Sequence, residues 1–323
     1  MKTAKKVLAI VLLLALTLAP VAYAEKPAKS WPSQDVHILT TVKAGGNMDI
    51  KARLVAKYLA EELGVNVVVD NAPGGGGVTG MTQYLAEKPN THTLIYMGVP
   101  HLTTAPFFSD VVYSEKDISI LSALDTVENG LFVSANSGIK TLDDLLALGK
   151  DGKIIKFGSA GVNNDTFLFT KVLFEMAGAA SDSVDADSSA ESLVNCIAGT
   201  VDVAYSAMNL AKSYVESGEM IPIGVFSAED YTGYEGITVP SFKSFGYDIQ
   251  YKATSFFAIR SGTDEEILEK ATNALNAVFT NDDFQKEFAD AGFVMMPDRS
   301  SEKINAEVNT LVAQLEGYKE LLQ

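Results

Sequence analysis

A short glycine-containing segment of the sequence combines the residue types that hold small anions. It contributes the candidate ligand residues Lys43, Ala44, Gly45, Gly46, Asn47 and Asp49. An apolar strand is predicted before it, over residues 36–41, and an amphipathic helix after it that ends near Gly64. We expect Asn47 to cap that helix. Glycines permit close approach of a ligand to the backbone, and unpaired amides at a helix N-terminus attract carboxylates and phosphates. The segment therefore predicts an anion site, although the same joint is common in any α/β protein.

Similar joints recur along the chain. A strand predicted over 154–157 leads into a small-residue loop and a helix over 165–177, and a strand over 201–205 leads into another helix. After these two strands the candidate ligand residues are Ser159, Ala160, Gly161, Val162, Asn163, Asn164, Thr166, Ser206 and Asn209. Another joint follows the strand over 93–97 and contributes Val99 and His101. His101 is interpreted either as a ligand contact or as a polar residue capping the strand end.

These elements alternate between strand and helix, which predicts an α/β fold with mostly parallel sheets. In such sheets ligands bind outside the carboxyl ends of the strands, where the candidate loops lie. Further strands are expected over 65–70, 118–124, 130–134, 221–227 and 255–260, and further helices over 81–87, 141–148, 265–280, 282–291 and 301–322. The pattern favours two domains that close over one small molecule.

Motifs for catalysis and for cofactors are missing from the sequence. The chain has three histidines, one cysteine, no H-E-x-x-H and no G-x-S-x-G, so the usual metal and hydrolase sites are not expected. Gly75, Gly77 and Gly80 match G-x-G-x-x-G, but the following strand ends without the acidic residue that a dinucleotide site requires. The sequence therefore indicates a binding protein without a cofactor or metal, and not an enzyme.

Charge and targeting signals limit the partners. The formal charge is -16, and removal of three signal lysines takes it to -16 - 3 = -19, which argues against nucleic acid as a partner. Residues 1–24 have the charged start, apolar core and small-residue end of a cleavable secretory signal, with cleavage near Ala24. No cysteine comes directly after that site, and Cys196, the one cysteine of the chain, has no second cysteine to pair with. We expect a mature periplasmic protein that begins near Glu25.

Several motifs together resemble one family. They are Ala44-Gly45-Gly46-Asn47-Met48-Asp49, Val67-Val68-Val69-Asp70-Asn71, Pro73-Gly74-Gly75-Gly76-Gly77, Gly158-Ser159-Ala160-Gly161, Gly199-Thr200-Val201-Asp202-Val203 and Gly292-Phe293. In these blocks the chain resembles the solute-binding proteins of bacterial tripartite tricarboxylate transporters, also called the Bug family. The resemblance covers nearly all of the mature chain.

The resemblance implies a type II periplasmic-binding-protein fold, with two α/β domains around a ligand cleft joined by two crossing strands. We expect residues 31–125 and 228–323 to form domain I and residues 126–227 to form domain II. It further implies a small organic acid as ligand, bound largely through backbone amides and ordered water, and integral membrane transporter subunits as partners.

Departures from the family pattern affect the ligand more than the fold. Where the family has a Tyr-Lys-Gly-Gly block, this chain has Ala186, Asp187, Ser188 and Ser189, so an acid replaces a lysine. We therefore add Asp187 and Ser188 to the candidate ligand residues and expect Asp187 to reject a second carboxylate or to accept an ammonium group. A monocarboxylate or an amino-bearing acid is then as credible as a di- or tricarboxylate. The functional alternatives are an exported ligand sensor that feeds a chemoreceptor, an exported enzyme of unfamiliar type, and a structural or adhesive protein.

Overall fold

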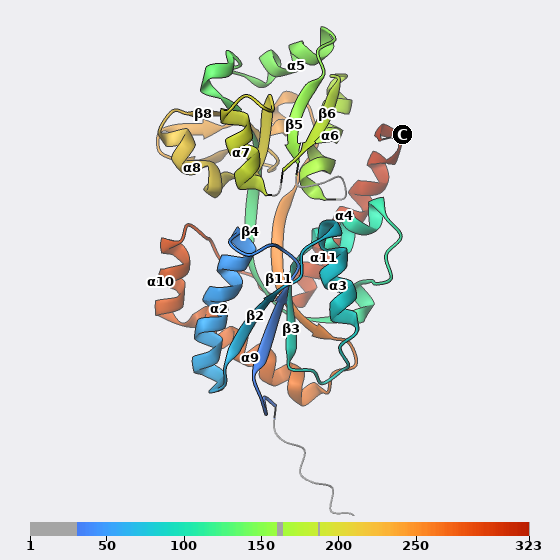
Figure 1. Cartoon of the computed structure of the whole chain (residues 1–323), viewed down its shortest axis with the longest axis vertical. Helices are drawn as coiled ribbons and strands as arrows, with labels where there is room; N and C mark the ends of the chain where they lie inside the picture. Colours follow the sequence, from blue (N-terminus) through green and yellow to red (C-terminus); the bar gives the residue numbers. More distant parts are fainter. Residues whose placement is uncertain (1–30, 160–163, 187, 323) are drawn as a thin grey trace, which may run out of the picture.

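The computed structural model describes residues 31–159, 164–186 and 188–322. Figure 1 shows strands and helices that alternate along the chain and gather into two groups, one above the other. The predicted α/β fold class is confirmed. No helix in the described residues combines the length and the apolar character that crossing a bilayer requires.

The lower group surrounds a sheet with the strand order β2-β1-β3-β11-β4. Its strands are β1 (Val36–Thr40), β2 (Val67–Asn71) and β3 (Thr93–Gly98), with parts of β4 (Ile118–Ser134) and β11 (Lys252–Arg260). Its helices are α2 (Asn47–Leu63), α3 (Val78–Leu85), α4 (Pro100–Phe108), α9 (Glu265–Thr280), α10 (Asp282–Asp290) and α11 (Ser301–Tyr318). Strands β1, β2 and β3 are parallel, so their carboxyl ends lie at one edge of the sheet.

The upper group repeats this order with other strands. In it β6 pairs with β5, β5 with β7, β7 with β4, and β4 with β8. Its strands are β5 (Ile155–Ser159), β6 (Ser181–Asp185), β7 (Val203–Ala207) and β8 (Met220–Val225), with a separate hairpin of β9 (Tyr231–Tyr234) and β10 (Ile237–Val239). Its helices are α5 (Leu142–Lys150), α6 (Asp165–Ala177), α7 (Ser189–Ile197) and α8 (Met208–Glu216).

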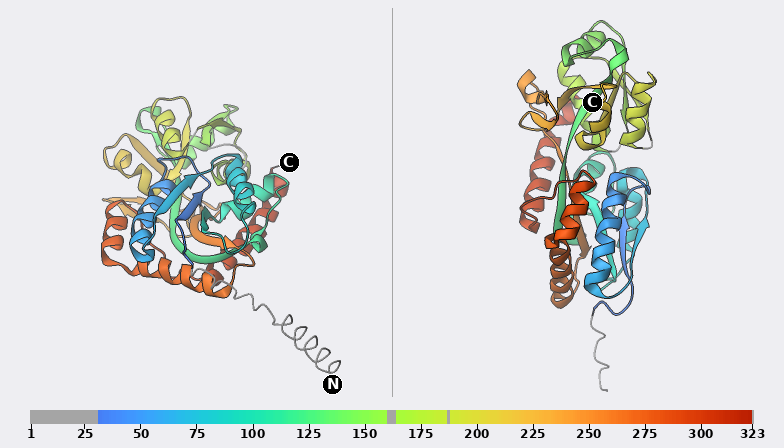
Figure 2. Two further views of the ribbon diagram at one scale, coloured as in Figure 1. Left: turned by 60° about the horizontal axis from the view of Figure 1, so that its bottom comes forward. Right: turned by 90° about the vertical axis from the view of Figure 1, so that its left-hand side faces the viewer.

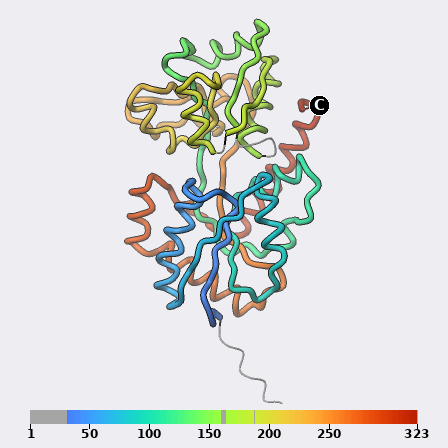
Figure 3. Tube along the Cα trace, in the orientation of Figure 1, coloured from blue at the N-terminus to red at the C-terminus, as the bar shows by residue number. Residues whose placement is uncertain are grey.

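Strand β4 links the two groups. Its first half pairs with β11, and its second half pairs with β7 and β8. The second view of Figure 2 shows β4, in green, running from one group into the other, and Figure 3 traces both β4 and the orange β11 between them. The sequence predicted two strands here, over 118–124 and 130–134, and this is wrong because β4 is one strand of 17 residues. Residues 125–129, between the two predicted strands, are mostly polar, but Asp125 there is fully buried and bonded to the side chains of Ser255 and Lys51.

Other elements follow the prediction where local signals are strong. The helices over 165–177 and 265–280 have the predicted bounds, and Thr141 caps α5 with Asp144 in a capping box. Strand β6, helix α7 and the β9–β10 hairpin were not predicted from the sequence. Strand β6 is a mostly polar edge strand, Ser-Asp-Ser-Val-Asp, so it lacks the apolar run that marks a buried strand.

Apolar side chains cover both faces of the lower sheet. One buried cluster lies between the sheet and helices α2, α9 and α10, and includes Leu59, Leu275 and Phe284. A second lies on the side of α3, α4 and α11 and continues into the upper group through Phe157 and Phe169. Helix α2 is thus held against the sheet along its whole inner side, with its N-terminus at the edge that faces the upper group (Figure 1).

A buried ion pair ties α2 to the linking strand. The ammonium group of Lys51 donates to the carboxylate of Asp125 on β4, and both side chains are almost fully buried. The hydroxyl group of Ser255 on β11 donates to the other carboxylate oxygen, and Tyr96 Oη lies 2.8 Å from Ser255 Oγ. The centroid of the Phe293 ring lies 5.0 Å from Lys51 Nζ. Each buried polar group in this network therefore has a partner, which a buried charge requires.

We expect Lys51→Met to lower the free energy of unfolding by about 3 to 5 kcal/mol, because it leaves the Asp125 carboxylate buried without its cation. Urea denaturation of the purified protein measures this. Lys57→Met is the matched control on the same helix, since Lys57 and its partner Glu287 are both about half exposed and water screens such a pair, so its loss should change the stability little. Equal losses in the two variants would contradict the prediction.

Candidate functional site

The loop between β1 and α2 is the predicted glycine turn, and the predicted strand and helix flank it. Lys43, Ala44 and Gly45 are exposed, and Gly45 has a φ of +88°, which favours glycine. The predicted N-cap is wrong by one position, because α2 begins at Asn47 and Gly46 occupies the cap position without a side-chain hydrogen bond. The physical reason is that the turn before the helix is held by Asp49, whose carboxylate accepts from the amide of Gly45, so the chain needs no side-chain cap at Asn47.

Asp49 is the third residue of α2. Its carboxylate accepts a hydrogen bond of 2.8 Å from the amide of Gly45, two from Arg53 and one of 2.9 Å from Asn71. Asn71 also donates to the carbonyl oxygen of Val42. Burial acts to raise the pKa of Asp49, but the hydrogen bonds from Arg53, Gly45 and Asn71 outweigh it and hold that pKa below its ordinary value. Asp49 thus fixes the shape of the loop through contacts with protein groups.

The fixed loop leaves the end of α2 available to an anion. The first four amides of an α-helix have no acceptor inside the helix, and here they belong to Gly46, Asn47, Met48 and Asp49, because the first helical bond runs from the amide of Ile50 to the carbonyl oxygen of Gly46. No side chain caps them, unlike the N-termini of α6 and α7. These amides and the positive end of the helix dipole form a site for a carboxylate or phosphate.

His101 joins the loops that follow β1, β2 and β3. Its Nε2 lies 2.8 Å from the hydroxyl group of Thr41, and its Nδ1 lies 3.0 Å from the amide nitrogen of Gly98 and 2.9 Å from the carbonyl oxygen of the same residue. A side chain at Gly77 would collide with the ring, since an added Cβ would overlap His101 Cδ2. The imidazole therefore occupies the space that Gly77 leaves open. Burial lowers the pKa of His101, which favours the neutral ring. Its neighbour Val99 is buried, and the Val99 amide donates to the carbonyl oxygen of Thr254.

The loop after β5 is described only at its ends. Ala160, Gly161, Val162 and Asn163 lie outside the described residues, as does Asp187. Ser159 and Thr166 are buried, with their hydroxyl oxygens 3.2 Å apart. Asn164 caps α6 by accepting from the amide of Phe167, and Thr166 donates to the same side-chain oxygen. The hydroxyl groups of this loop are thus joined in one network at the N-terminus of α6.

The remaining candidate residues lie on other loops of the upper group. Ser188 caps α7 by accepting from the amide of Glu191, and Ser206 is buried at the end of β7. Asn209, in the first turn of α8, donates to the carbonyl oxygen of Gly292 at 3.3 Å, a contact between the upper and lower groups. Its side-chain oxygen is buried without a hydrogen-bond partner in the described residues. The structure therefore distributes the candidates over the loops where the two groups face each other.

One polar cluster near these loops was not predicted from the sequence. Asp165, the first residue of α6, accepts a hydrogen bond of 3.4 Å from Tyr205 of β7. Burial raises the pKa of the Asp165 carboxyl, and the nearby hydroxyl groups of Tyr251 and Tyr205 act in the opposite direction. Tyr251 comes from the segment just before β11 and stacks on Phe169 at 4.3 Å between ring centroids. The sequence showed only that Asp165 stands at the start of a helix. The two tyrosines could not be linked to it because they are distant along the chain.

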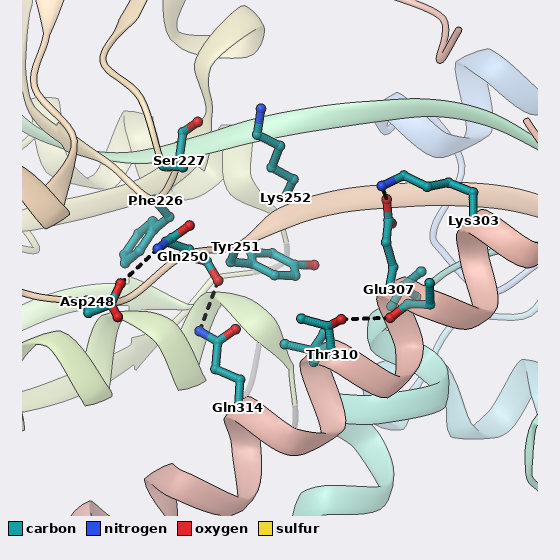
Figure 4. Close-up of a pocket in the computed structure, with 14 residues that line it drawn as sticks. Phe226, Ser227, Asp248, Gln250, Tyr251, Lys252, Lys303, Glu307, Thr310 and Gln314 are labelled. Atoms are coloured by element: carbon teal, nitrogen blue, oxygen red, sulfur yellow. Dashed lines mark hydrogen bonds and ion pairs between the residues drawn. The ribbon is translucent and has the colours of Figure 1, made fainter. Parts of the chain in front are cut away.

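A cavity of about 570 Å³ is lined in part by Tyr251 and by residues of α11. It is lined by Val99, Phe226, Ser227, Ala228, Asp248, Gln250, Tyr251, Lys252, Lys303, Ala306, Glu307, Thr310, Leu311 and Gln314. Figure 4 shows Gln314 of α11 donating to the backbone of Gln250, and Lys303 paired with Glu307. Val99 is the only predicted ligand residue among the described residues that line it, so this cavity is distinct from the glycine loop.

The partly buried position of His101 predicts a pH-dependent stability. Because the folded chain lowers the pKa of His101 below its ordinary value of 6.5, the unfolded chain takes up the proton first as the pH falls. The free energy of unfolding should therefore decrease as the pH falls below about 6.5, and His101→Gln should lose this part of the dependence. Urea denaturation at several pH values measures it, in a His92→Gln background because burial also lowers the pKa of that histidine. The same pH slope with and without His101 would contradict the prediction.

Known proteins resemble the chain along most of its length. A family model described as tripartite tricarboxylate transporter family receptor matches residues 51–313. A UPF0065 protein of Bordetella bronchiseptica is 26% identical over 287 residues, which cover 88% of this chain and 85% of that protein. The protein BugT of Bordetella pertussis is 24% identical over 291 residues, which cover 87% of this chain and 88% of that protein.

Solved structures share the fold. The periplasmic binding protein BugD aligns with a TM-score of 0.79 at 21% identity and covers 90% of this chain and 98% of its own. MatC from Rhodopseudomonas palustris with bound malate aligns with a TM-score of 0.79 at 19% identity. The alignment covers 91% of this chain and 100% of the MatC chain. The fold predicted from the resemblance, that of periplasmic binding proteins, is confirmed. Since the family match spans well over half of its residues, the chain belongs to the tripartite tricarboxylate transporter family of receptors.

Proposed function

We propose that the chain is a periplasmic solute-binding protein that captures a small organic carboxylate and delivers it to an integral membrane transporter of the tripartite tricarboxylate type. The observation that carries this proposal is the uncapped N-terminus of α2 beside a glycine loop that Asp49 holds in shape. Family membership supports it, as does the bound malate in the similar structure of MatC. The protein acts by binding and release, without catalysis.

The strength of such a site is adequate without an arginine. A hydrogen bond from a backbone amide to a carboxylate contributes roughly 1.5 to 3 kcal/mol net, and a helix terminus roughly 0.3 to 1 kcal/mol. Four or five such bonds with two helix termini therefore reach about 8 kcal/mol, the scale of a micromolar complex, after the costs of association. The carboxylate lies between the loop of Ala44 to Asn47 and the loop after β5, in this proposal. The side chains that select among acids are Lys43, Asn47, Asn163, Thr166, Asp187, Ser206 and Asn209.

The two groups of elements act as the two lobes of the receptor. In this proposal residues 31–125 and 228–323 form one lobe and residues 126–227 the other. The pairing of β4 supports the division, because its register partners change from β11 to β7 and β8 near Asn129. The repeated strand order of the two groups supports it as well.

Gly46→Pro tests the use of backbone amides. Gly46 has a φ of -83°, close to the value of about -65° that proline requires, so the variant removes an amide with little change of the loop. Gly46→Ala is the matched control, because it keeps the amide and its Cβ would meet no atom closer than 3.9 Å. We expect Gly46→Pro to weaken acid binding at least about tenfold and Gly46→Ala to change it little. Calorimetry with mono-, di- and tricarboxylates and neutral sugars measures both. Binding of sugars alone, or equal affinity in both variants, would exclude this site.

Export and transporter binding are tested on one preparation. We expect the protein from the periplasm to have the intact mass of a chain that begins near Glu25. After loading with an acid that calorimetry has identified, it should crosslink to an integral membrane protein in membranes of its own host. Retention of residues 1–24, or the absence of any crosslinked membrane protein with and without the acid, would count against this part of the proposal.

A further inference from the structure

The cavity of about 570 Å³, here called the α11 cavity, is formed where the chain returns from the upper group and enters β11. Its walls come from residues 226–228 after β8, from residues 248–252, from one side of α11 and from Val99. Its volume falls within the range of about 300 to 1,000 Å³ that is typical of small-molecule sites. No residue of the glycine loop, 43–49, contributes to the lining. The α11 cavity is therefore a separate space of a size that suits a ligand.

The hydroxyl group of Tyr251 points to a ligand in this cavity. Tyr251 is 4% exposed, and its hydroxyl is buried without a hydrogen-bond partner in the described residues. Figure 4 shows this hydroxyl directed toward α11. Burial and the nearby carboxylates of Asp165 and Glu307 raise the pKa of Tyr251, so the hydroxyl keeps its proton and is a donor. A buried donor without an acceptor costs free energy, which a ligand oxygen would offset.

Other polar groups of the cavity are held in place and keep positions for a ligand. The side-chain amide of Gln314 donates to the carbonyl oxygen of Gln250 at 3.0 Å and to the hydroxyl of Tyr318 at 2.6 Å. These bonds use both amide hydrogens of Gln314, so its side-chain oxygen is the part left for a ligand. Gln250 donates to the carboxylate of Asp248 at 2.8 Å, and a carboxylate offers about four acceptor positions. The cavity thus contains acceptors as well as the Tyr251 donor.

The charges around the cavity balance each other. The charged residues of the lining are two acids and two lysines: Asp248, Glu307, Lys252 and Lys303. Lys303 lies 3.3 Å from the Glu307 carboxylate, and Lys252 lies 2.7 Å from the carboxylate of Glu128. An anion would meet two acids and lysines that are already paired, and a cation would meet two lysines. The lining therefore favours an uncharged ligand.

Apolar surface completes the lining. Val99, Phe226 and Leu311 are buried residues of the wall, and the ring of Tyr251 lies among the lining residues. A molecule that matches these walls needs hydroxyl groups for the polar side chains and C–H groups for the apolar ones. Sugars and cyclic polyols have hydroxyl groups around the rim of a ring whose faces carry C–H groups. Their chemistry fits the lining.

We propose that the α11 cavity is a second binding site, separate from that of the carboxylate, for an uncharged polyhydroxyl molecule of the size of a monosaccharide. In this site Tyr251 donates to an oxygen of the ligand, and Asp248 and Gln314 accept from its hydroxyl groups. The ring of the ligand packs against Phe226 and Leu311. The inference does not depend on the proposed function, because the two sites use different loops.

A panel of sugars tests the ligand class. Glucose, galactose, mannose and myo-inositol are the uncharged probes, and glucosamine and glucuronate carry a charge of either sign on the same ring as glucose. Ligand-observed NMR on the whole mature protein, at slightly acidic pH and millimolar probe, detects weak binding. We expect at least one uncharged probe to bind. The charged probes should occupy this cavity at least about tenfold more weakly than the tightest uncharged probe, because each leaves a charge without a partner.

Two exposed alanines of α11 provide a blocking variant and its control. Ala306 lines the cavity, whereas Ala313 on the same helix does not. Ala306→Trp places an indole in the cavity and should lower the affinity for the uncharged probe at least about tenfold. Ala313→Trp should leave that affinity unchanged, since surface substitutions away from such features have small effects. Thr310→Trp, at another exposed position of the lining, replaces Ala306→Trp if that variant does not fold.

Tyr251→Phe tests the hydroxyl group by itself. We expect it to weaken binding of the uncharged probe about two- to tenfold, the equivalent of one hydrogen bond. The unfolding temperature of the free protein should not fall, because the variant removes a buried polar group that has no partner. A hydroxyl with only a structural role would give the opposite pair of results, a lower unfolding temperature and unchanged sugar affinity.

The outcomes separate this inference from the proposed function. The inference is wrong if none of the four uncharged probes binds the wild-type protein, if their binding survives the blocking variant, or if charged probes occupy the cavity equally well. Sugar binding that the blocking variant removes, in a protein that binds no acid, would support the α11 cavity and refute the carboxylate receptor. Acid binding without any such sugar binding would refute the second site and leave the receptor in place.

Discussion

The buried ion pair of Lys51 and Asp125 is the interaction on which the arrangement of the site depends. It joins α2, whose N-terminus faces the candidate site, to β4, the strand that pairs with both groups. Desolvating two charges costs several kcal/mol per ion unless other hydrogen bonds complete the network, and here Ser255 and Tyr96 do so. The pair thereby fixes the direction of the helix dipole relative to the linking strand. A helix held by apolar contacts alone has more ways to shift along its sheet.

The loop after β1 shows how an acidic protein can hold an anion. Its strongly charged neighbours, Asp49 and Arg53, neutralise each other through a two-bond contact, and the acid also takes the amide of Gly45. The long-range field of the protein is negative, whereas the local field at the end of α2 is positive because dipoles act within about one helical turn. Recognition at short range and repulsion at long range therefore coexist.

Much of the fold was predictable from the sequence because its signals are local. Apolar spacing and caps gave the bounds of α6 and α9, and glycines gave the loop before α2. The misplaced N-cap and the division of β4 have a common cause. Asp49 and Asp125 are held by hydrogen bonds from Asn71 and Ser255, which are distant along the chain. Nothing in the sequence around Lys51 indicates that its side chain is buried. Nothing around Asp165 indicates that Tyr205 and Tyr251 lie near it. The spacing of apolar residues along the sequence does not reveal contacts between distant segments. The loops of the site were therefore predicted, but the hydrogen bonds between their side chains were not.

The cap position of α2 has a consequence for how such receptors diverge. At Gly46 the backbone has a conformation open to ordinary residues, and the space around it is free. A main-chain amide is present in every amino acid except proline, so substitution at such a position alters the side chain and leaves the donor in place. Related receptors can therefore keep their affinity for a carboxylate while the residue at this position changes. Two receptors with few identical residues can share an anchor for the carboxylate and differ in the rest of the molecule they transport, and overall sequence identity is a poor measure of what each one carries.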